Sequence, residues 1–244
     1  AVALLFAGQG GVQCGAGRAL AQHSPIFRTL LDETLAAAGP FWPDELRRVL
    51  WDDDAAWHRV EVQPALVVLQ IALGRYWRAV GLEPRLLMGH SLGEYAAACL
   101  AGVLTVEDTL RLVCARAQLL RDRCAPGRML AVLAPAADVR PLLEPWAGQV
   151  AIAAINGPRH TVLSGTAAAL AALEPQCTAR QWRCRALETT HAFHSPLVEP
   201  ALDAFRQVAE QVAYQRPQWP YVSSLTGTWA PDEVASADYW CRHL

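Results

Sequence analysis

The sequence predicts an α/β fold with a largely parallel sheet, interrupted by a small subdomain of β-α-β-β-α-β order. Over the first half of the chain, short apolar runs alternate with amphipathic helical stretches. After Pro126-Gly127 the order of the expected strands and helices changes. The composition agrees: 244 residues with 53% apolar and 18% charged residues describe a globular protein able to bury a large core.

The first half of the chain reads as strands that each lead into helices. Val2–Phe6 is a short apolar run that ends at Gly8-Gln9-Gly10, as expected of a buried strand entering a tight loop. A second strand is expected over 85–88. Gly81 is a typical glycine at a helix C-terminus. The expected helices span residues 18–23, 25–38, 62–80, 94–100 and 106–123.

Residues 128–190 are expected to form a ferredoxin-like small subdomain, inserted into a main domain made of 1–127 and 191–244. After it the chain returns to the main domain and continues as a helix through Val212. Within the subdomain we expect strands at 129–133, 150–155, 161–163 and 182–187, and helices at 137–146 and 166–174.

Composition narrows the possible partners and compartments. A net charge of -2 leaves no basic footprint for nucleic acid or an anionic membrane. The seven cysteines, an odd count without a C-x-x-C pair, indicate reduced thiols, and neither Cys nor His falls at metal-ligand spacing. No signal peptide or membrane span is visible, and a start without Met suggests a piece of a longer polypeptide. We therefore expect a cytoplasmic protein that holds no metal.

Residues 89–93, Gly-His-Ser-Leu-Gly, follow a predicted strand and precede a helix of small residues. G-x-S-x-G in this context predicts a sharp turn that lifts the Ser91 hydroxyl clear of the backbone. The flanking glycines are needed because a side chain there would collide with the neighbouring strand and helix. Amides at the start of the helix favour the negative charge that develops on an attacked carbonyl oxygen. Ser91 is therefore the candidate nucleophile.

A serine nucleophile needs a base, and histidine is the usual one. His90 is adjacent in sequence, but a neighbour on a tight turn projects away from the reacting direction. His191 and His194 lie where the small subdomain rejoins the large one, and a cleft between domains is the expected place for a site. The pattern alone leaves these two histidines as alternatives.

Together these motifs resemble the acyltransferase domain of modular polyketide synthases, which are relatives of malonyl-CoA:acyl carrier protein transacylases. The matching stretches run in order over nearly the whole chain. They are Gly8-Gln9-Gly10, Gln63-Pro64-Ala65-Leu66, residues 89–94, Arg116, Asn156-Gly157-Pro158, residues 191–196 and Asp238-Tyr239-Trp240.

The resemblance implies an α/β-hydrolase-like core with an inserted ferredoxin-like subdomain, and a two-step transfer without a bound cofactor. The serine takes a malonyl-type group from malonyl-CoA and passes it to the phosphopantetheine thiol of an acyl carrier protein. A ketosynthase domain would be its neighbour in a megasynthase. By position, Ser91 is the nucleophile and His194 the general base. The backbone amides of Gln9 and Leu92 would form the oxyanion hole.

Further residues are implied to bind the substrate. Arg116 would hold the free carboxylate of a malonyl group, since a planar guanidinium pairs with a carboxylate through two parallel hydrogen bonds. Residues 191–194, His-Ala-Phe-His, resemble the malonyl-selecting version of the family, and the Phe193 ring would fill the space that a methylmalonyl branch needs. A single methyl is worth only about 1–3 kcal/mol, so leakage is expected.

Four more positions complete the expected substrate-binding set. His191 belongs to the same segment as His194, and His90 would line the acyl pocket as a polar neighbour of Ser91. Gln63 and Asn156 either contact the substrate or only satisfy local backbone groups.

The chain departs from the family pattern at Gly11-Val12, at Ala117-Gln118 and at Ser224, and the first departure would reshape the loop that bears Gln9. Alternative readings are an acyltransferase that selects methylmalonyl or another extender, a serine hydrolase or thioesterase, and a non-enzymatic spacer. Arg116 argues against a general esterase, which has no use for a carboxylate clamp. The intact nucleophile, base and clamp argue against a spacer.

Overall fold

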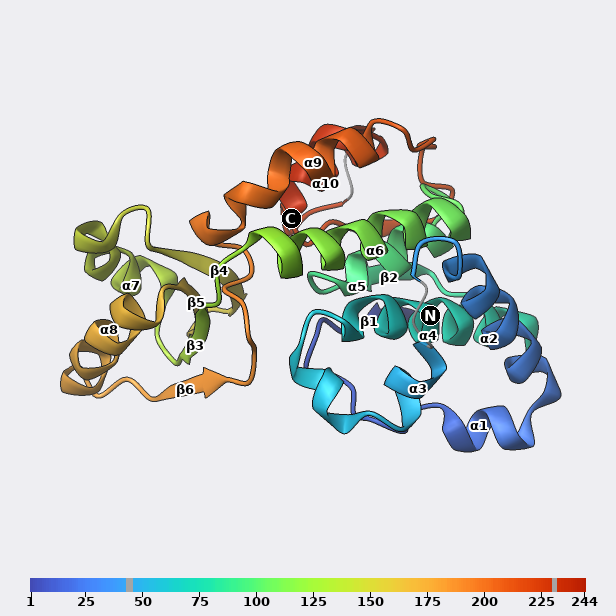
Figure 1. Ribbon diagram of the computed structural model, residues 1–244, viewed down its shortest axis with the longest axis horizontal. Helices are drawn as coiled ribbons and strands as arrows, with labels where there is room; N and C mark the ends of the chain where they lie inside the picture. Colours follow the sequence, from blue (N-terminus) through green and yellow to red (C-terminus); the bar gives the residue numbers. More distant parts are fainter. Residues whose placement is uncertain (43–45, 230–231) are drawn as a thin grey trace. The chain divides into compact units, whose positions relative to one another are not determined.

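The computed structural model describes residues 1–42, 46–229 and 232–244 (Figure 1). Its chain forms two compact units. Unit 1 comprises Ala1–Gln118 and Ala204–His243, and unit 2 comprises Leu119–Asp203 with Leu244. Apart from the step to Leu244, the chain passes from one unit to the other inside helices, α6 (Val106–Arg123) and α9 (Glu199–Ala209).

Unit 1 contains a parallel sheet in the order β1-β2-β7, formed by β1 (Ala3–Phe6), β2 (Leu86–Gly89) and β7 (Tyr221–Val222). Phe6 pairs with Gly89, so β1 and β2 end side by side. Parallel neighbours need long crossovers, which the helices between these strands supply. The α/β class expected from the sequence is confirmed.

The helices of unit 1 bury the sheet through small and aliphatic side chains. α5 packs on β1 and β2, and α4 packs on α5 and on α2. α4 is buried over most of its length, and Gly81 follows it at φ +92°, which is the left-handed conformation expected of a terminating glycine. The helices of this unit, besides those that cross into unit 2, are α1 (Arg18–His23), α2 (Pro25–Ala38), α3 (Leu46–Trp51), α4 (Val62–Ala79), α5 (Gly93–Leu100) and α10 (Ala237–His243), with 3₁₀ turns at Asp54–His58 and Asp232–Ala235.

Unit 2 contains an antiparallel sheet in the order β4-β5-β3-β6 (Figure 1). Its core gathers apolar side chains from strands and helices, among them Leu130, Val139, Leu163 and Leu173. The element order is the expected β-α-β-β-α-β. The elements are β3 (Arg128–Val132), α7 (Ala136–Leu143), β4 (Val150–Gly157), β5 (His160–Gly165), α8 (Ala167–Ala179) and β6 (Cys184–Leu187), with 3₁₀ turns at Glu144–Trp146 and Pro196–Val198.

Several boundaries in unit 2 differ from the expected ones, and three of the differences have a clear physical reason. The helix expected over 137–146 ends at Leu143 and continues as a 3₁₀ turn, since Pro145 has no amide proton to continue the α-helical pattern. α8 runs past Pro175 to Ala179, because Leu173 and Cys177 on either side pack into the core. β4 extends through Asn156 to Gly157, where a turn was expected to begin, because Gly157 still pairs with His160.

Within the described residues, no helix is long and apolar enough to cross a membrane. The same ranges contain no group of three or more His, Cys, Asp or Glu side chains placed to hold a metal ion. None of the seven cysteines, all of which lie in the described residues, forms a disulfide.

Candidate active site

Ser91 lies in a tight turn between β2 and α5, at φ +50°. Only three non-glycine residues in the described parts of the chain have a positive φ, and the other two are Gln181 and His194. This left-handed conformation costs a non-glycine residue roughly 1–2 kcal/mol. Two backbone hydrogen bonds close the turn: Gly93 N–H donates to the His90 carbonyl at 3.0 Å, and Glu94 N–H to the Ser91 carbonyl at 2.8 Å. The geometry is that of a nucleophile elbow.

Both glycines of the motif are required by close backbone contacts. A Cβ added to Gly89 would stand 2.2 Å from the Glu94 nitrogen, and one added to Gly93 would stand 2.2 Å from the Phe6 carbonyl oxygen. Neither contact can relax by rotating a side chain, because the opposing atoms belong to the backbone. The steric reason given for the motif from the sequence therefore holds in the fold.

The loop after β1 lies against this elbow. His90 N–H donates to the Phe6 carbonyl at 2.9 Å, and a Cβ on Gly8 would be 3.0 Å from the His90 carbonyl oxygen. Gln9 follows Gly8 directly. Leu92 is buried at the position just before α5. The two proposed oxyanion-hole residues thus belong to adjacent loops, at the carboxyl ends of adjacent parallel strands.

A chain of side-chain hydrogen bonds joins three of the predicted residues in unit 1. Arg116 is 1% exposed, and its Nη1 donates to Gln63 Oε1. Gln63 Nε2 donates to Gln9 Oε1 at 3.1 Å, and Gln9 Nε2 donates to the Arg59 carbonyl at 3.0 Å. Gln63 therefore links the candidate carboxylate clamp to the loop that bears Gln9, a role that sequence reasoning did not assign to it.

His194 of unit 2 also has a left-handed backbone, at φ +57°, and is half-buried. The next residue, Ser195, spans this turn: its hydroxyl donates to the Ala192 carbonyl at 2.7 Å and accepts from Leu197 N–H at 3.2 Å. Phe193 is buried, and its ring stacks with that of His191 at a centroid distance of 6.1 Å. Sequence alone left two histidines open, and the uncommon backbone distinguishes His194 from His191.

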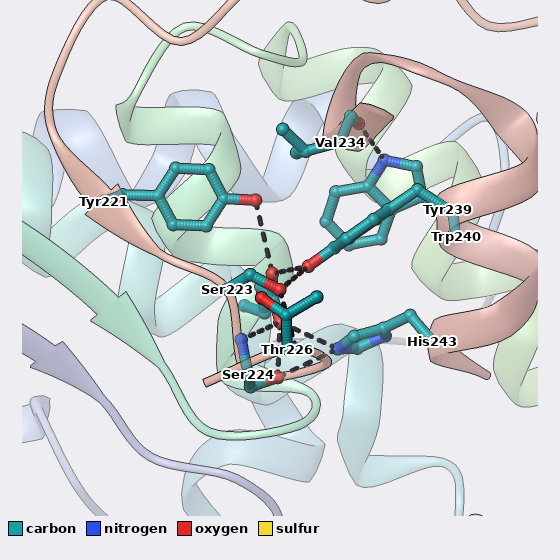
Figure 2. Close-up of polar contacts among 9 residues, drawn as sticks. Tyr221, Ser223, Ser224, Thr226, Val234, Tyr239, Trp240 and His243 are labelled. Carbon is teal, nitrogen blue, oxygen red and sulfur yellow. Dashed lines mark hydrogen bonds and ion pairs between the residues drawn. The ribbon is translucent and has the colours of Figure 1, made fainter. Parts of the chain in front are cut away.

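A fully buried carboxylate, Glu94, follows the elbow in the first turn of α5. Its Oε1 accepts hydrogen bonds from the hydroxyls of Tyr221, at 3.2 Å, and Tyr239. Its Oε2 accepts from the hydroxyl and, at 2.9 Å, the backbone N–H of Ser224, and lies 3.2 Å from Nε2 of His243. Figure 2 shows these four partners converging from β7, the segment after it and α10. We call Glu94 and these four residues the Glu94 cluster.

The residues of the Glu94 cluster shift one another's pKa values through their charges and hydrogen bonds. Burial by itself raises the pKa of Glu94, but the His243 imidazole and hydrogen bonds from His243, Ser224 and Tyr239 hold that pKa below its ordinary value. Burial and the nearby carboxylate raise the pKa values of Tyr221 and Tyr239 well above the ordinary tyrosine range. The cluster therefore holds one buried anion surrounded by neutral hydroxyl donors.

The structure groups the sequence-predicted residues by unit. The first group, in unit 1, contains Gln9, Gln63, His90, Ser91, Leu92 and Arg116; His90 is exposed. The second group, in unit 2, contains His191, Phe193 and His194, and also Asn156, which is exposed near the end of β4. Sequence reasoning missed the Glu94 cluster. The sequence did single out three of its members, since Glu94 and Tyr239 stand in stretches that match the family and Ser224 stands at a departure from it, but it assigned none of them a role.

Known proteins match this chain over nearly its whole length. A family model described as "Acyl transferase domain" matches residues 3–244. The chain is 40% identical over 251 residues to the polyketide synthase GfsE of Streptomyces halstedii, covering 100% of the chain and 7% of that protein. It is 40% identical over 242 residues to the mycoketide-CoA synthase of Mycobacterium tuberculosis, covering 98% of the chain and 6% of that protein.

Solved structures agree with these sequence matches. The acyltransferase domain from the second module of the salinomycin polyketide synthase superposes with a TM-score of 0.91 at 41% identity, covering 99% of this chain and 56% of that one. The malonyl CoA-acyl carrier protein transacylase of Coxiella burnetii has a TM-score of 0.88 at 26% identity, covering 100% and 79%.

The chain spans only a small part of the synthases it matches, 7% and 6% of the two named above. The matches nevertheless cover this chain almost from end to end, and the solved structures share its fold. The chain belongs to the acyl transferase domain family and is an acyltransferase domain of the modular polyketide synthase type.

Proposed function

We propose that this acyltransferase moves a malonyl unit from malonyl-CoA, through an ester on Ser91, to the phosphopantetheine thiol of an acyl carrier protein in polyketide synthesis. The observation that carries the proposal is the Ser91 turn, where a strained serine at φ +50° is locked between two glycines that admit no side chain. Strain of this kind persists where the surrounding structure over-determines it, and it concentrates at sites of function.

The proposed reaction has two half-reactions. His194 takes the Ser91 proton while Oγ attacks the thioester carbonyl, and the amides of Gln9 and Leu92 stabilise the oxyanion. The C–S bond then breaks, and the imidazolium protonates the departing thiolate of coenzyme A. In the second half, His194 takes the proton of the carrier thiol, whose sulfur attacks the ester, and Ser91 regains a proton as the new thioester forms. The protein needs no bound cofactor for these steps.

Arg116 is the proposed clamp for the malonyl carboxylate. Its guanidinium is buried and donates to Gln63 Oε1. An arginine stays protonated in proteins, so its side chain offers a positive charge to a carboxylate. A charge-assisted hydrogen bond is roughly twice as strong as one between neutral groups. Acetyl-CoA offers no carboxylate, so the clamp would favour malonyl-CoA.

Selection against a branched extender is assigned to unit 2. Phe193 is 7% exposed and its ring is held against His191, so it resists displacement by an α-methyl group. We propose that this segment favours malonyl over methylmalonyl, with His191 and His90 as polar neighbours of the acyl group and Asn156 as a further contact.

The domain architecture proposed for this activity has an α/β-hydrolase-like core, residues 1–127 and 191–244, and a ferredoxin-like subdomain, residues 128–190. The parallel sheet of unit 1 and the antiparallel order β4-β5-β3-β6 of unit 2 support this assignment. We further propose a cytoplasmic megasynthase in which the partners are an acyl carrier protein and a neighbouring ketosynthase domain.

The test is the mass of the intact protein after incubation with malonyl-CoA. A malonyl adduct should form on the unmutated chain and be absent from Ser91→Ala. Arg116→Ala should reduce the malonyl-to-acetyl labelling ratio about tenfold to a hundredfold, the worth of a hydrogen bond to a charged group. Arg111→Ala is the matched control on the same helix, because Arg111 bonds to the side chain of Gln211 and not to Gln63.

Several outcomes would contradict the proposal. An unlabelled but folded unmutated chain would exclude malonyl transfer, and equal labelling by acetyl-CoA would exclude the Arg116 clamp. Faster labelling by methylmalonyl-CoA would overturn the role of Phe193. Discharge of the acyl-enzyme by water rather than by a pantetheine thiol would identify a hydrolase.

A further inference from the structure

Glu94 is joined to the nucleophile through the backbone. Its amide nitrogen donates to the Ser91 carbonyl at 2.8 Å, and this bond closes the turn that holds Ser91 at φ +50°. A residue in a disfavoured conformation relaxes unless its neighbours hold it. The position of the Glu94 main chain therefore governs the direction of the Ser91 hydroxyl.

The Glu94 side chain is tied to two distant segments of unit 1. Tyr221 and Ser224 come from β7 and the segment after it, and Tyr239 and His243 come from α10 (Figure 2). Aromatic packing reinforces the α10 side, since the Tyr95 ring lies 4.6 Å from the ring of Trp240. The first turn of α5 is thus fixed from outside the elbow.

We infer that Glu94 is a positioning residue for the nucleophile, whose carboxylate ties the Ser91 turn to β7 and α10; this rests on the proposed role of Ser91. A carboxylate is suited to this task because it is an acceptor only, and here it faces five donors. A charge placed in the first turn also interacts favourably with the helix dipole. Stability alone is a weak reason for it, since well-packed apolar groups often replace buried ion pairs without loss.

The change Glu94→Gln tests this at nearly constant volume. A carboxamide has one acceptor oxygen and introduces two donors, so it cannot accept all five hydrogen bonds. The tyrosine and serine hydroxyls can rotate to compensate, but the backbone N–H of Ser224 cannot. We expect the turn to lose its fixed position while the helix remains.

The readout is single-turnover labelling of Ser91, by malonyl-CoA and by a small fluorophosphonate, over a range of reagent concentrations. Glu94→Gln should reduce the limiting rate about tenfold to a hundredfold with both reagents, as expected for misplacement of about 1 Å. The half-saturating concentration should stay within about twofold, because the binding groups are intact. Near-ultraviolet circular dichroism reports the folded fraction.

Tyr239→Phe and Tyr214→Phe form a matched pair. Each removes one tyrosine hydroxyl from unit 1, but Tyr214 bonds to the Ala209 carbonyl, away from Glu94. Tyr239→Phe should slow labelling and Tyr214→Phe should not. If Glu94→Gln does not fold, Tyr239→Phe and Ser224→Ala carry the test, each removing side-chain donation to the carboxylate.

Equal limiting rates for folded Glu94→Gln and the unmutated protein would overturn the inference, as would equal slowing by Tyr214→Phe and Tyr239→Phe. Loss of thermal stability with an unchanged rate per folded molecule would indicate a structural role only. Labelling by the fluorophosphonate without labelling by malonyl-CoA would refute the proposed substrate and leave the positioning role measurable. No labelling by either reagent would refute both.

Discussion

Ser91 and His194 share an uncommon backbone conformation although they lie in different units. Their φ values are +50° and +57°, and only Gln181 joins them among the described non-glycine residues. Each turn is constrained by a nearby residue. The Ser91 turn includes Gly93, where there is no room for a side chain, and the His194 turn is spanned by the hydrogen bonds of Ser195. At the scale of single residues, the candidate catalytic groups are therefore held where the backbone is least free.

The elbow glycines give a steric prediction. Gly89→Ala or Gly93→Ala should destabilise the protein by about 1–3 kcal/mol and suppress labelling of Ser91, because each new Cβ meets backbone atoms at 2.2 Å. Gly157→Ala is the control, as nothing lies within 4 Å of its added Cβ. Urea unfolding would measure the stability of each variant, and the mass of the intact protein after incubation with malonyl-CoA would measure its labelling. A Gly93→Ala protein as stable and as reactive as the unmutated chain would contradict the contact argument.

The buried charge of Glu94 predicts how the unfolding free energy depends on pH. Its pKa in the fold lies below the ordinary 4.5, so its charge contributes stability above about pH 4.5, and this contribution is lost as the pH falls through the lowered pKa. The unfolding free energy of the unmutated protein should therefore exceed that of Glu94→Gln by less at pH 3 than at pH 7. Tyr221, Tyr239 and Tyr95 stay neutral in this window, because even the ordinary tyrosine pKa of 10.0 lies above it and burial raises their pKa values further.

The control for this pH series is Glu107→Gln, an exposed acidic residue in the first turn of α6. Its effect on the unfolding free energy should stay within about 0.5 kcal/mol throughout. A difference between Glu94→Gln and the unmutated protein that does not change from pH 7 to pH 3 would show that the carboxylate charge does not contribute to stability.

At the scale of elements, the functional groups cluster where strands end. β1 and β2 end together at the Phe6–Gly89 pair, and the loop with Gln9 and the elbow with Ser91 follow them. In parallel sheets this carboxyl edge is the usual place for a site. Helix periodicity predicted most of the helices that deliver these loops, but it missed α3 and α10. Proline and core packing moved two further helix ends, at Pro145 and Pro175.

The segment after β6 gives an element-scale prediction. Ser195→Ala removes both hydrogen bonds that span the His194 turn, so labelling of Ser91 should slow about tenfold with a stability loss of about 1 kcal/mol. Thr166→Ala removes a comparable cap in the same unit, at α8, and should lower stability alone. Similar labelling rates for the two variants would argue against a role for the Ser195 bonds in holding His194.

At the scale of the whole molecule, each unit has its own buried core. Unit 1 buries Leu66 on α4, and unit 2 buries Leu163 on β5, both at 0% exposure. Compact units with separate cores often open independently. The two half-reactions proposed here draw on groups from both units, with Ser91 and Arg116 in one and His194 in the other.

Because the two units have separate cores, a cavity made in one core should loosen only the unit that contains it. Leu66→Ala and Leu163→Ala should each cost about 2–5 kcal/mol, and faster amide hydrogen exchange should be confined to the unit that carries the change. Exchange measured by mass spectrometry of peptides would resolve this. Equal acceleration in both units by either variant would indicate a single cooperative structure.

The sequence by itself determined the order of most of the elements, the α/β class, the elbow and the candidate serine, because these depend on residues that are close together along the chain. It did not predict α3, β7 or α10. Gly-His-Ser-Leu-Gly after a strand needs only local sterics to predict its turn. The family resemblance added roles for His194 and Arg116 by position. Which of two histidines carries the uncommon backbone could not be told from pattern alone.

Only the tertiary structure decided which distant groups meet. Gln63 joins Arg116 and Gln9 across separations of 53 and 54 residues, and Tyr239 reaches Glu94 across 145. Local periodicity carries no information at such distances, since the contacts arise when strands and helices pack against one another. A buried carboxylate in an apolar helix therefore becomes interpretable only when the fold supplies the donors that surround it.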